Sequence, residues 1–220
     1  MILFCATATF WIFSTAAACS DRTDRLFDRM VMTEVLIEAG LTLIREAESS
    51  PSLTDRARAC QVRDGLMVAL LALCPIRLKN FVALEIGRSF VEIRGRWWIV
   101  LSAAETKENR PDERPINELL TPIIKRYLGQ HRPVLARTNT TPSALWLSKD
   151  GAPRSYVQVG RVIKMTTLAT VGVEVSPHLF RTCGATTAAI HGGENPYLAV
   201  HFCTTVIRTS PTLPTTEQQV

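Results

Sequence analysis

A histidine and an arginine three positions apart mark the part of this sequence with the clearest chemical potential. His178 and Arg181 follow Ser176 and Pro177, which suit the N-cap and the first position of a helix. Positions three apart share one helix face, so both side chains would lie beside the unpaired N–H groups at the positive end of the helix dipole. Such an arrangement favours binding of a phosphate. The same spacing is common by chance, so a phosphate site requires support from other residues.

Two further basic residues lie where the expected elements begin or end. Arg77 follows Pro75, which ends a strongly apolar helix predicted over residues 57–73. Lys107 lies in the charged segment 105–115, where the default interpretation is a solvated surface charge. Arginines can clamp phosphate oxygens through bidentate hydrogen bonds, a lysine can protonate a leaving oxygen, and a histidine can exchange a proton near neutral pH. Together with His178 and Arg181, these residues supply the groups that a phosphodiester reaction requires.

The remaining pattern predicts helices joined to a small hairpin. Helical periodicity is found over residues 33–48, 57–73, 117–128 and 155–170, and Ser176 precedes a buried helix that ends near Gly192 and Gly193. A short helix is expected through Leu84 and Ile86, and segment 105–115 is expected to be an exposed hairpin or turn. Residues 90–94 and 97–101, separated by Gly95, predict a β-hairpin, and residues 144–147 predict a short strand or extended segment.

Composition predicts a soluble protein with a real core and a weak bias toward polyanions. The chain has 220 residues, 46% of them hydrophobic, and 25 Lys and Arg against 20 Asp and Glu, for a net charge of +5. Its six cysteines are scattered without a CxxC pair or a zinc-like cluster. We therefore expect reduced thiols in a cytoplasmic protein, with no metal and no cofactor.

Residues 1–20 are apolar and end in small residues, as a signal peptide does. No Lys or Arg precedes the apolar run, since the first is Arg22, and threonines and serines interrupt it. We expect no membrane association and interpret the segment as foreign to the domain that follows. An exported or membrane-tethered protein remains an alternative.

From about Arg56 to Ala199 the chain resembles the catalytic domain of the tyrosine recombinases, also called phage-type integrases. The resemblance rests on three motifs in the family's order: CPIRLKNFVALEIG, ETKENRPDERP and SPHLFRTCGATTAAIHGG. It implies an α+β, mainly helical fold with a small antiparallel sheet. It also implies that Arg77 and Arg181 bind the scissile phosphate of double-stranded DNA, that His178 assists, and that Lys107 is the general acid toward the departing 5′ oxygen, without a metal.

The implied activity is DNA integration and site-specific recombination through a 3′-phosphotyrosine intermediate. The family requires a tyrosine downstream of the HxxR motif, whereas the one tyrosine beyond Arg181 is Tyr197, 16 residues later. That position is too early for the family's nucleophile, and Tyr197 is interpreted as structural. No nucleophile is assigned, and the chain is expected to be a catalytic-domain remnant of a mobile-element recombinase, inactive alone.

The tail also departs from the family pattern. Synonymous codons can be chosen for residues 200–220 so that the same bases, shifted by two, encode PFLHHRDPDVTDATYNRATS. This alternative product contains the histidine pair and the downstream tyrosine that the family needs. We expect a frameshift near Ala199, which the nucleotide sequence would test directly.

The expected organisation has four parts: a non-family apolar N-terminus over residues 1–20, a lead-in helical segment over 21–55, the recombinase catalytic domain over 56–199, and an aberrant tail over 200–220. A recombinase homo-oligomer or an intact relative is an expected partner. The main alternative is a noncatalytic DNA-binding module that interferes with an intact recombinase or complements it. A chain that fails to fold is a further alternative.

Overall fold

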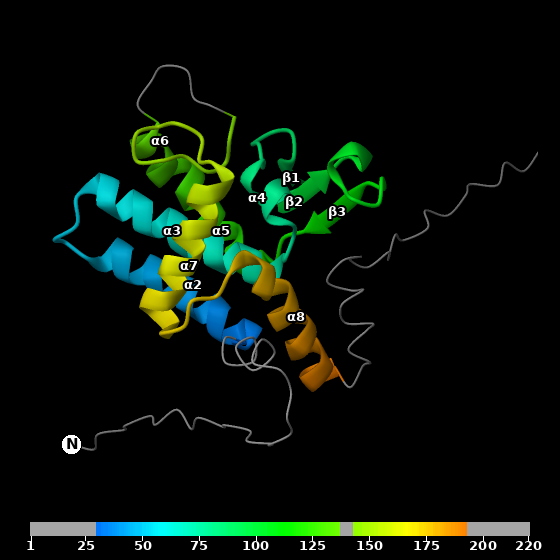
Figure 1. Cartoon of the computed structure of the whole chain (residues 1–220). Helices are drawn as coiled ribbons and strands as arrows, with labels where there is room; N and C mark the ends of the chain where they lie inside the picture. Colours follow the sequence, from blue (N-terminus) through cyan, green and yellow to red (C-terminus); the bar gives the residue numbers. More distant parts are fainter. Residues whose placement is uncertain (1–29, 137–142, 193–220) are drawn as a thin grey trace, which may run out of the picture.

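A long helix, α3 (Asp55–Leu73), lies at the centre of the structure, a computed structural model that describes residues 30–136 and 143–192 (Figure 1). The hydroxyl of Thr54 accepts the N–H of Ala57 at 3.3 Å and caps the helix. The apolar run 65–72 is entirely buried, and Cys74 and Pro75 follow the last turn. The predicted position and burial of this helix are confirmed.

Helix α2 (Thr33–Ser49) crosses α3 at a point where both helices carry a glycine. A Cβ atom added to Gly40 would lie 2.6 Å from the Gly65 carbonyl oxygen, and one added to Gly65 would lie 2.6 Å from that of Gly40. The two backbones therefore approach more closely than any side chain would permit. This contact places Leu36 and Ile44 of α2 in the main hydrophobic core.

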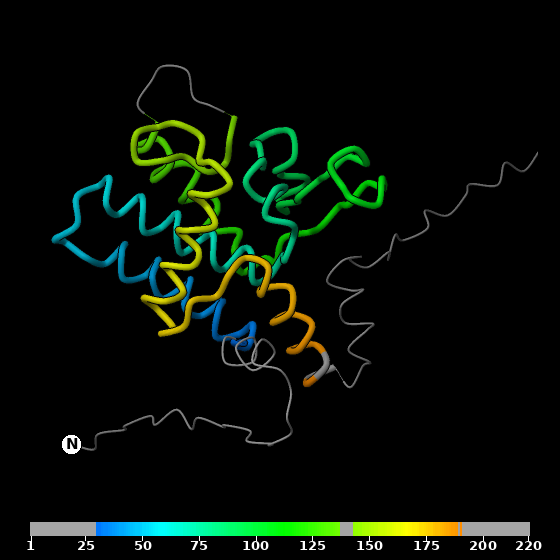
Figure 2. Tube along the Cα trace, in the orientation of Figure 1, coloured from blue at the N-terminus to red at the C-terminus, as the bar shows by residue number. Residues whose placement is uncertain are grey.

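Two C-terminal helices pack across this pair, as the trace in Figure 2 shows. Helix α7 (Tyr156–Val171) contacts α2, α3 and the short helix α4 (Leu78–Val82). It begins with a capping box between Ser155 and Gln158 and ends at Gly172, whose φ of +78° suits glycine. Helix α8 (Pro177–Gly192) contacts α2, α3 and α7. Both helices were predicted, and α8 begins at the expected proline.

A three-stranded antiparallel sheet in the order β1-β2-β3 lies beside α4 in Figure 1. It comprises β1 (Phe90–Ile93), β2 (Arg96–Leu101) and β3 (Asp112–Pro115). Arg94 and Gly95, with φ angles of 52° and 80°, form the tight turn between β1 and β2. The predicted hairpin is therefore confirmed.

Strand β3 was not recognised in the sequence, because its four residues are DERP and read as an exposed turn. It pairs with β2 over Trp98–Leu101, after the 3-10 turn η1 (Ala103–Glu105). Arg114 is only 2% exposed, and Asp112 holds its guanidinium through bonds of 2.8 to 3.0 Å. Because the Asp112 carboxylate neutralises the buried Arg114 guanidinium, β3 can pack against the core despite its charged sequence.

The short helix after Arg77 ends earlier than predicted. Helix α4 stops at Val82, and Glu85 and Ile86 instead form isolated β-bridges with Ala144 and Phe90. The N–H of Leu145 donates to the Leu84 carbonyl at 2.8 Å. The extended segment predicted at residues 144–147 thus supplies backbone partners that end the helix.

Helical structure between residues 118 and 135 is longer than predicted. Asn117 caps it as expected, by accepting the N–H of Leu119 at 2.9 Å. The segment then continues past the expected end at Leu128, as η2 (Glu118–Leu120), α5 (Thr121–Arg126), the π-helical turn η3 (Tyr127–His131) and α6 (Arg132–Leu135). A widened turn ahead of Pro133 accommodates a residue that has no N–H to donate.

The expectations for residues 1–20, Tyr197 and the tail lie outside the described residues. Within the described ranges, no helix has the length and apolar character needed to cross a membrane.

Candidate functional site

Three of the four predicted site residues line one pocket of about 830 Å³. Arg77 precedes α4, whereas His178 and Arg181 lie in the first turns of α8. Residues of α7, further residues of α4 and the segment before α8 complete the wall. The structure therefore brings together two motifs that are about a hundred positions apart in the sequence.

Arg77 is the half-buried N-cap residue of α4. Its carbonyl oxygen accepts the N–H groups of Asn80 and Phe81, each at 2.9 Å. Phe81 is fully buried, and the indole N–H of Trp146 donates to its carbonyl oxygen at 2.8 Å. These contacts fix the backbone from which the Arg77 side chain extends.

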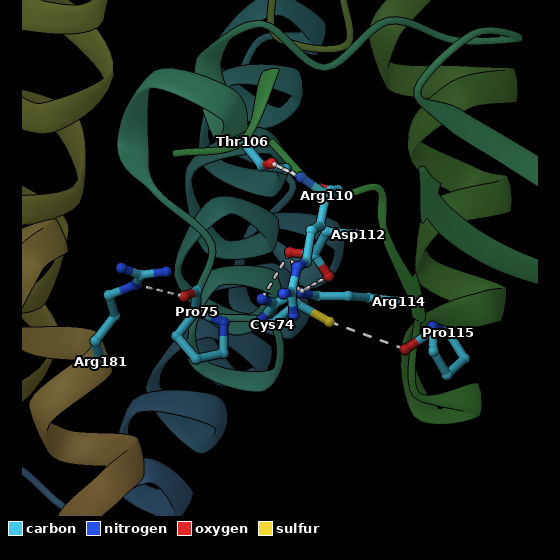
Figure 3. Close-up of polar contacts among 8 residues, drawn as sticks. All are labelled: Cys74, Pro75, Thr106, Arg110, Asp112, Arg114, Pro115 and Arg181. Carbon is cyan, nitrogen blue, oxygen red and sulfur yellow. Dashed lines mark hydrogen bonds and ion pairs between the residues drawn. The ribbon is translucent and has the colours of Figure 1, made fainter. Parts of the chain in front are cut away.

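Arg181 is held against the segment that carries Arg77. Its Nε donates to the Pro75 carbonyl at 2.9 Å, as Figure 3 shows. On the opposite side of α8, Leu179, Phe180 and Cys183 are buried in the core. The helix thus presents Arg181 at the pocket while its apolar face fixes its position.

His178 is exposed and lies in the first turn of α8, where the N–H of Leu179 donates to the Ser176 carbonyl at 2.8 Å. Ser176 and Pro177 also line the pocket. The helix start predicted from these residues is confirmed. The pocket therefore lies at the positive end of α8.

The pocket is strongly basic beyond the predicted residues. Lys79 of α4 and Arg161 and Lys164 of α7 also line it, and Glu174 is the one acidic residue in its described lining. Glu174 is paired with Lys164 at 2.8 Å. The cationic charge of Arg77, Lys79 and Arg161 is therefore not balanced within the pocket.

Lys107 does not line this pocket. It is exposed in the connection between β2 and β3, in a turn closed by Thr106 and Arg110. The Thr106 hydroxyl accepts the N–H of Arg110 at 3.1 Å and lies 2.6 Å from its carbonyl oxygen (Figure 3). Lys107 is therefore an exposed residue of this connection and not part of the described pocket lining.

The Cys74–Pro75 junction nevertheless connects the two regions. Cys74 lies between Arg181 and β3 in Figure 3, and its thiol donates to the Pro115 carbonyl at 3.9 Å. Burial raises the pKa of Cys74 to about 11, so the thiol stays protonated and chemically inert. This junction therefore has a structural role. Cys74 contacts the end of β3, the strand that follows Lys107, and Pro75 accepts the hydrogen bond from Arg181.

The start of the β2–β3 connection is fixed by Glu105. Its carboxylate accepts the N–H and the hydroxyl of Ser102 at 2.9 and 2.8 Å and pairs with Arg88 at 2.9 Å. These contacts, the backbone N–H of Ser102 first, lower the pKa of Glu105 to about 2. The segment that precedes Lys107 is thus anchored by an ionised carboxylate.

Glu105→Gln should therefore destabilise the chain in a pH-dependent manner. A lowered pKa in the folded state stabilises the protein above the unfolded-state value, near 4.5, and this contribution disappears as the pH falls toward about 2. Denaturant titrations should show the full difference between variant and wild type at about pH 7 and none at the acidic end. Glu108→Gln, the same charge change in the same connection, is the control. An equal effect of both variants at all pH values would contradict the assignment.

Two tyrosines of the described residues differ sharply in exposure. Tyr127 is fully buried, its hydroxyl donates to the Leu145 carbonyl at 3.0 Å, and burial raises its pKa. Tyr156 is 56% exposed and lines the basic pocket from the first turn of α7. Tyr156, Lys79 and Arg161 were not predicted as site residues from the sequence. The three-residue spacing of Arg161 and Lys164 on a predicted helix was the available signal for a basic face.

No cluster of three or more His, Cys, Asp or Glu side chains that would hold a metal ion occurs in residues 30–136 and 143–192. The pocket's polar side chains are predominantly cationic, which suits an anionic ligand.

No protein-family model matches the sequence, and no curated protein matches it either. The structure, in contrast, has the fold of a tyrosine-recombinase catalytic domain: α+β, mainly helical, with a small antiparallel sheet. A similar solved structure is that of the XerH site-specific recombinase bound to its difH substrate in a pre-cleavage complex. The TM-score is 0.54 at 13% sequence identity.

The match covers 81% of this chain and 50% of the XerH chain, so this chain spans about half the length of that protein. At this level of identity the similarity establishes the fold. The predicted fold class is confirmed, and the roles of individual residues depend on the geometry of the pocket.

Proposed function

We propose that this chain binds duplex DNA through the basic pocket and is the catalytic-domain part of a site-specific recombinase. The observation that carries the proposal is the meeting of Arg77, His178 and Arg181 in one pocket of a recombinase-like fold. Two arginines and a helix N-terminus can bind the nonbridging oxygens of a phosphodiester and stabilise charge that develops on them. His178 would hydrogen-bond the same phosphate.

In the proposed reaction, a tyrosine hydroxyl loses its proton to solvent and attacks the phosphorus, the bond from phosphorus to the 5′ oxygen breaks, and that oxygen leaves with a proton from Lys107. The tyrosine becomes joined to the 3′ phosphate, and reversal of the step rejoins the strand. Tyr127 is buried and hydrogen-bonded, which makes it unsuited to attack. Tyr156 is exposed at the pocket but precedes the HxxR motif, whereas the family's nucleophile follows that motif. We therefore propose that the chain does not supply the nucleophile and is inactive alone.

The second candidate function is a noncatalytic DNA-binding module that interferes with an intact recombinase or receives a tyrosine from it. The exposed position of Lys107, outside the pocket, favours this possibility. A pocket that holds a phosphate without a general acid beside it can bind DNA and cannot complete the reaction.

Binding and covalent trapping test these proposals together. The purified chain should bind a fluorescein-labelled duplex of about 20 base pairs, roughly two helical turns, with an affinity that falls as salt rises. Absence of binding at low salt would contradict the proposed function. With nicked duplexes of randomised sequence, we expect no protein–DNA adduct that survives denaturant.

An adduct formed by the wild-type chain would contradict the missing nucleophile. Tyr156→Phe is the matched variant, because Tyr156 is the exposed tyrosine among the described residues of the pocket. An adduct that this substitution abolishes would assign the attack to Tyr156, and one that persists would direct attention to Tyr197.

A further inference from the structure

We propose that Lys79 and Arg161 form a second phosphate site in the same pocket, so that the chain grips two backbone phosphates of its DNA. This inference rests on the proposed function and extends it, because Arg77 and Arg181 account for one phosphate. Lys79 and Arg161 come from α4 and α7 and are both exposed on the pocket wall.

Packing between α4 and α7 brings together the two helices that carry these cations. A Cβ atom added to Gly160 would lie 3.4 Å from Cδ2 of Leu78, so α7 approaches α4 at this glycine. Lys79 directly follows Leu78, and Arg161 directly follows Gly160. Both side chains therefore start from a rigid helix–helix contact.

The charges at this contact have no protein partner. Among the described residues, the side chains of Lys79 and Arg161 form no hydrogen bond or ion pair, whereas Lys164 is neutralised by Glu174 at 2.8 Å. An anion bound by both side chains would balance their charges. Lys79 and Arg161 are thus poised for a ligand, and Lys164 is not.

The dimensions of the pocket agree with a ligand larger than one phosphate. Its volume of about 830 Å³ lies in the upper part of the range for binding pockets, roughly 300 to 1,000 Å³. A ligand that meets both pairs of cations carries successive phosphates. This requirement is met by a nucleic-acid strand and not by inorganic phosphate.

The salt dependence of binding measures the number of phosphates contacted. For a duplex of about 20 base pairs, log K falls with log[salt] by about 0.9 for each phosphate neutralised. Lys79→Ala, Arg161→Ala and the double variant should each bind more weakly, and the double variant should lose about 1 from the slope, the share of a single phosphate. Arg161→Lys keeps the charge and should keep most of the slope.

Lys125→Ala is the matched control, because Lys125 pairs with Glu92 outside the pocket and the change removes the same charge. A wild-type slope in the Lys79→Ala, Arg161→Ala double variant, or losses of affinity in the two single variants no greater than that of Lys125→Ala, would overturn the second site. Such a result leaves the proposed function standing if Arg77→Ala still weakens binding. Far-UV circular dichroism should show the same helicity and melting for all variants, because both side chains are exposed.

Discussion

Arg77→Ala is expected to weaken binding of duplex DNA by roughly ten- to a hundredfold at low salt. The side chain is half-buried in the basic pocket and has no hydrogen-bond or ion-pair partner among the described residues. Loss of a hydrogen bond to a charged group costs about 1.5 to 3 kcal/mol, and each 1.4 kcal/mol is about tenfold in affinity. The salt dependence should fall by about one phosphate contact. Fluorescence anisotropy at several salt concentrations measures both quantities.

Two further variants test whether a loss of DNA affinity in Arg77→Ala is specific to the pocket. Arg77→Lys keeps the charge but lacks the planar fork that binds two phosphate oxygens, so we expect an intermediate affinity. Arg45→Ala removes the same charge from an exposed ion pair with Glu38 on α2, outside the pocket, and should have little effect. Equal losses for Arg77→Ala and Arg45→Ala would show that binding is diffuse and would contradict the pocket as the DNA site.

Arg181 is a less simple probe, because its side chain also supports the fold. Its Nε donates to the Pro75 carbonyl at 2.9 Å, two residues before Arg77. Removal of Arg181 would therefore disturb the backbone that carries the other arginine. The contact with the Pro75 carbonyl thus joins Arg181 to the segment that carries Arg77.

Local sequence motifs were sufficient to place three of the predicted residues correctly at the starts of helices. His178 and Arg181 lie three positions apart in one helix, and Ser176 and Pro177 indicate the start of that helix. Arg77 follows a proline that ends a buried helix, which is also a local signal. The meeting of these two motifs depends on tertiary packing of α8 near α3 and α4, and only the family resemblance indicated it.

Strand β3 and two pocket residues, Lys79 and Arg161, were not predicted, because their charged side chains are typical of exposed turns and surfaces. Strand β3 reads as a charged turn because its inward-facing Arg114 is neutralised by Asp112, a pairing that alternation of apolar residues cannot reveal. Lys79 and Arg161 resemble ordinary surface charges in the sequence. They become a site through the Gly160–Leu78 contact, which joins residues more than eighty positions apart.

For Lys107 the sequence supplied a motif but no indication of where the side chain lies relative to the pocket. The resemblance implies a role for Lys107 at the phosphate, and in the structure the residue is exposed in the β2–β3 connection and does not line the pocket. The connection is anchored at its start by Glu105 and closed by Thr106 and Arg110. Sequence order alone does not determine whether such a connection lies over a pocket or beside it.

The largest effect on stability is expected for Trp146→Ala, at about 3 to 5 kcal/mol of the free energy of unfolding. Trp146 is 1% exposed, and its ring centroid lies 5.1 Å from that of Phe81 and 6.0 Å from that of Tyr127. Its N–H also donates to the Phe81 carbonyl at 2.8 Å. The substitution removes the aromatic packing and leaves a buried carbonyl without its donor. Denaturant titration followed by circular dichroism measures the loss.

Trp146→Phe separates packing from hydrogen bonding, because it keeps an aromatic ring and removes the N–H. We expect a smaller loss, about 1 to 3 kcal/mol, for the unpaired carbonyl. Because Phe81 belongs to α4, which begins directly after Arg77, this variant should also lower DNA affinity while the salt slope stays unchanged, since no phosphate contact is removed. A Trp146→Ala variant within about 1 kcal/mol of wild type would contradict the central role of this residue in the core. A reduced salt slope in Trp146→Phe would show instead that loosening α4 withdraws Arg77 from the phosphate.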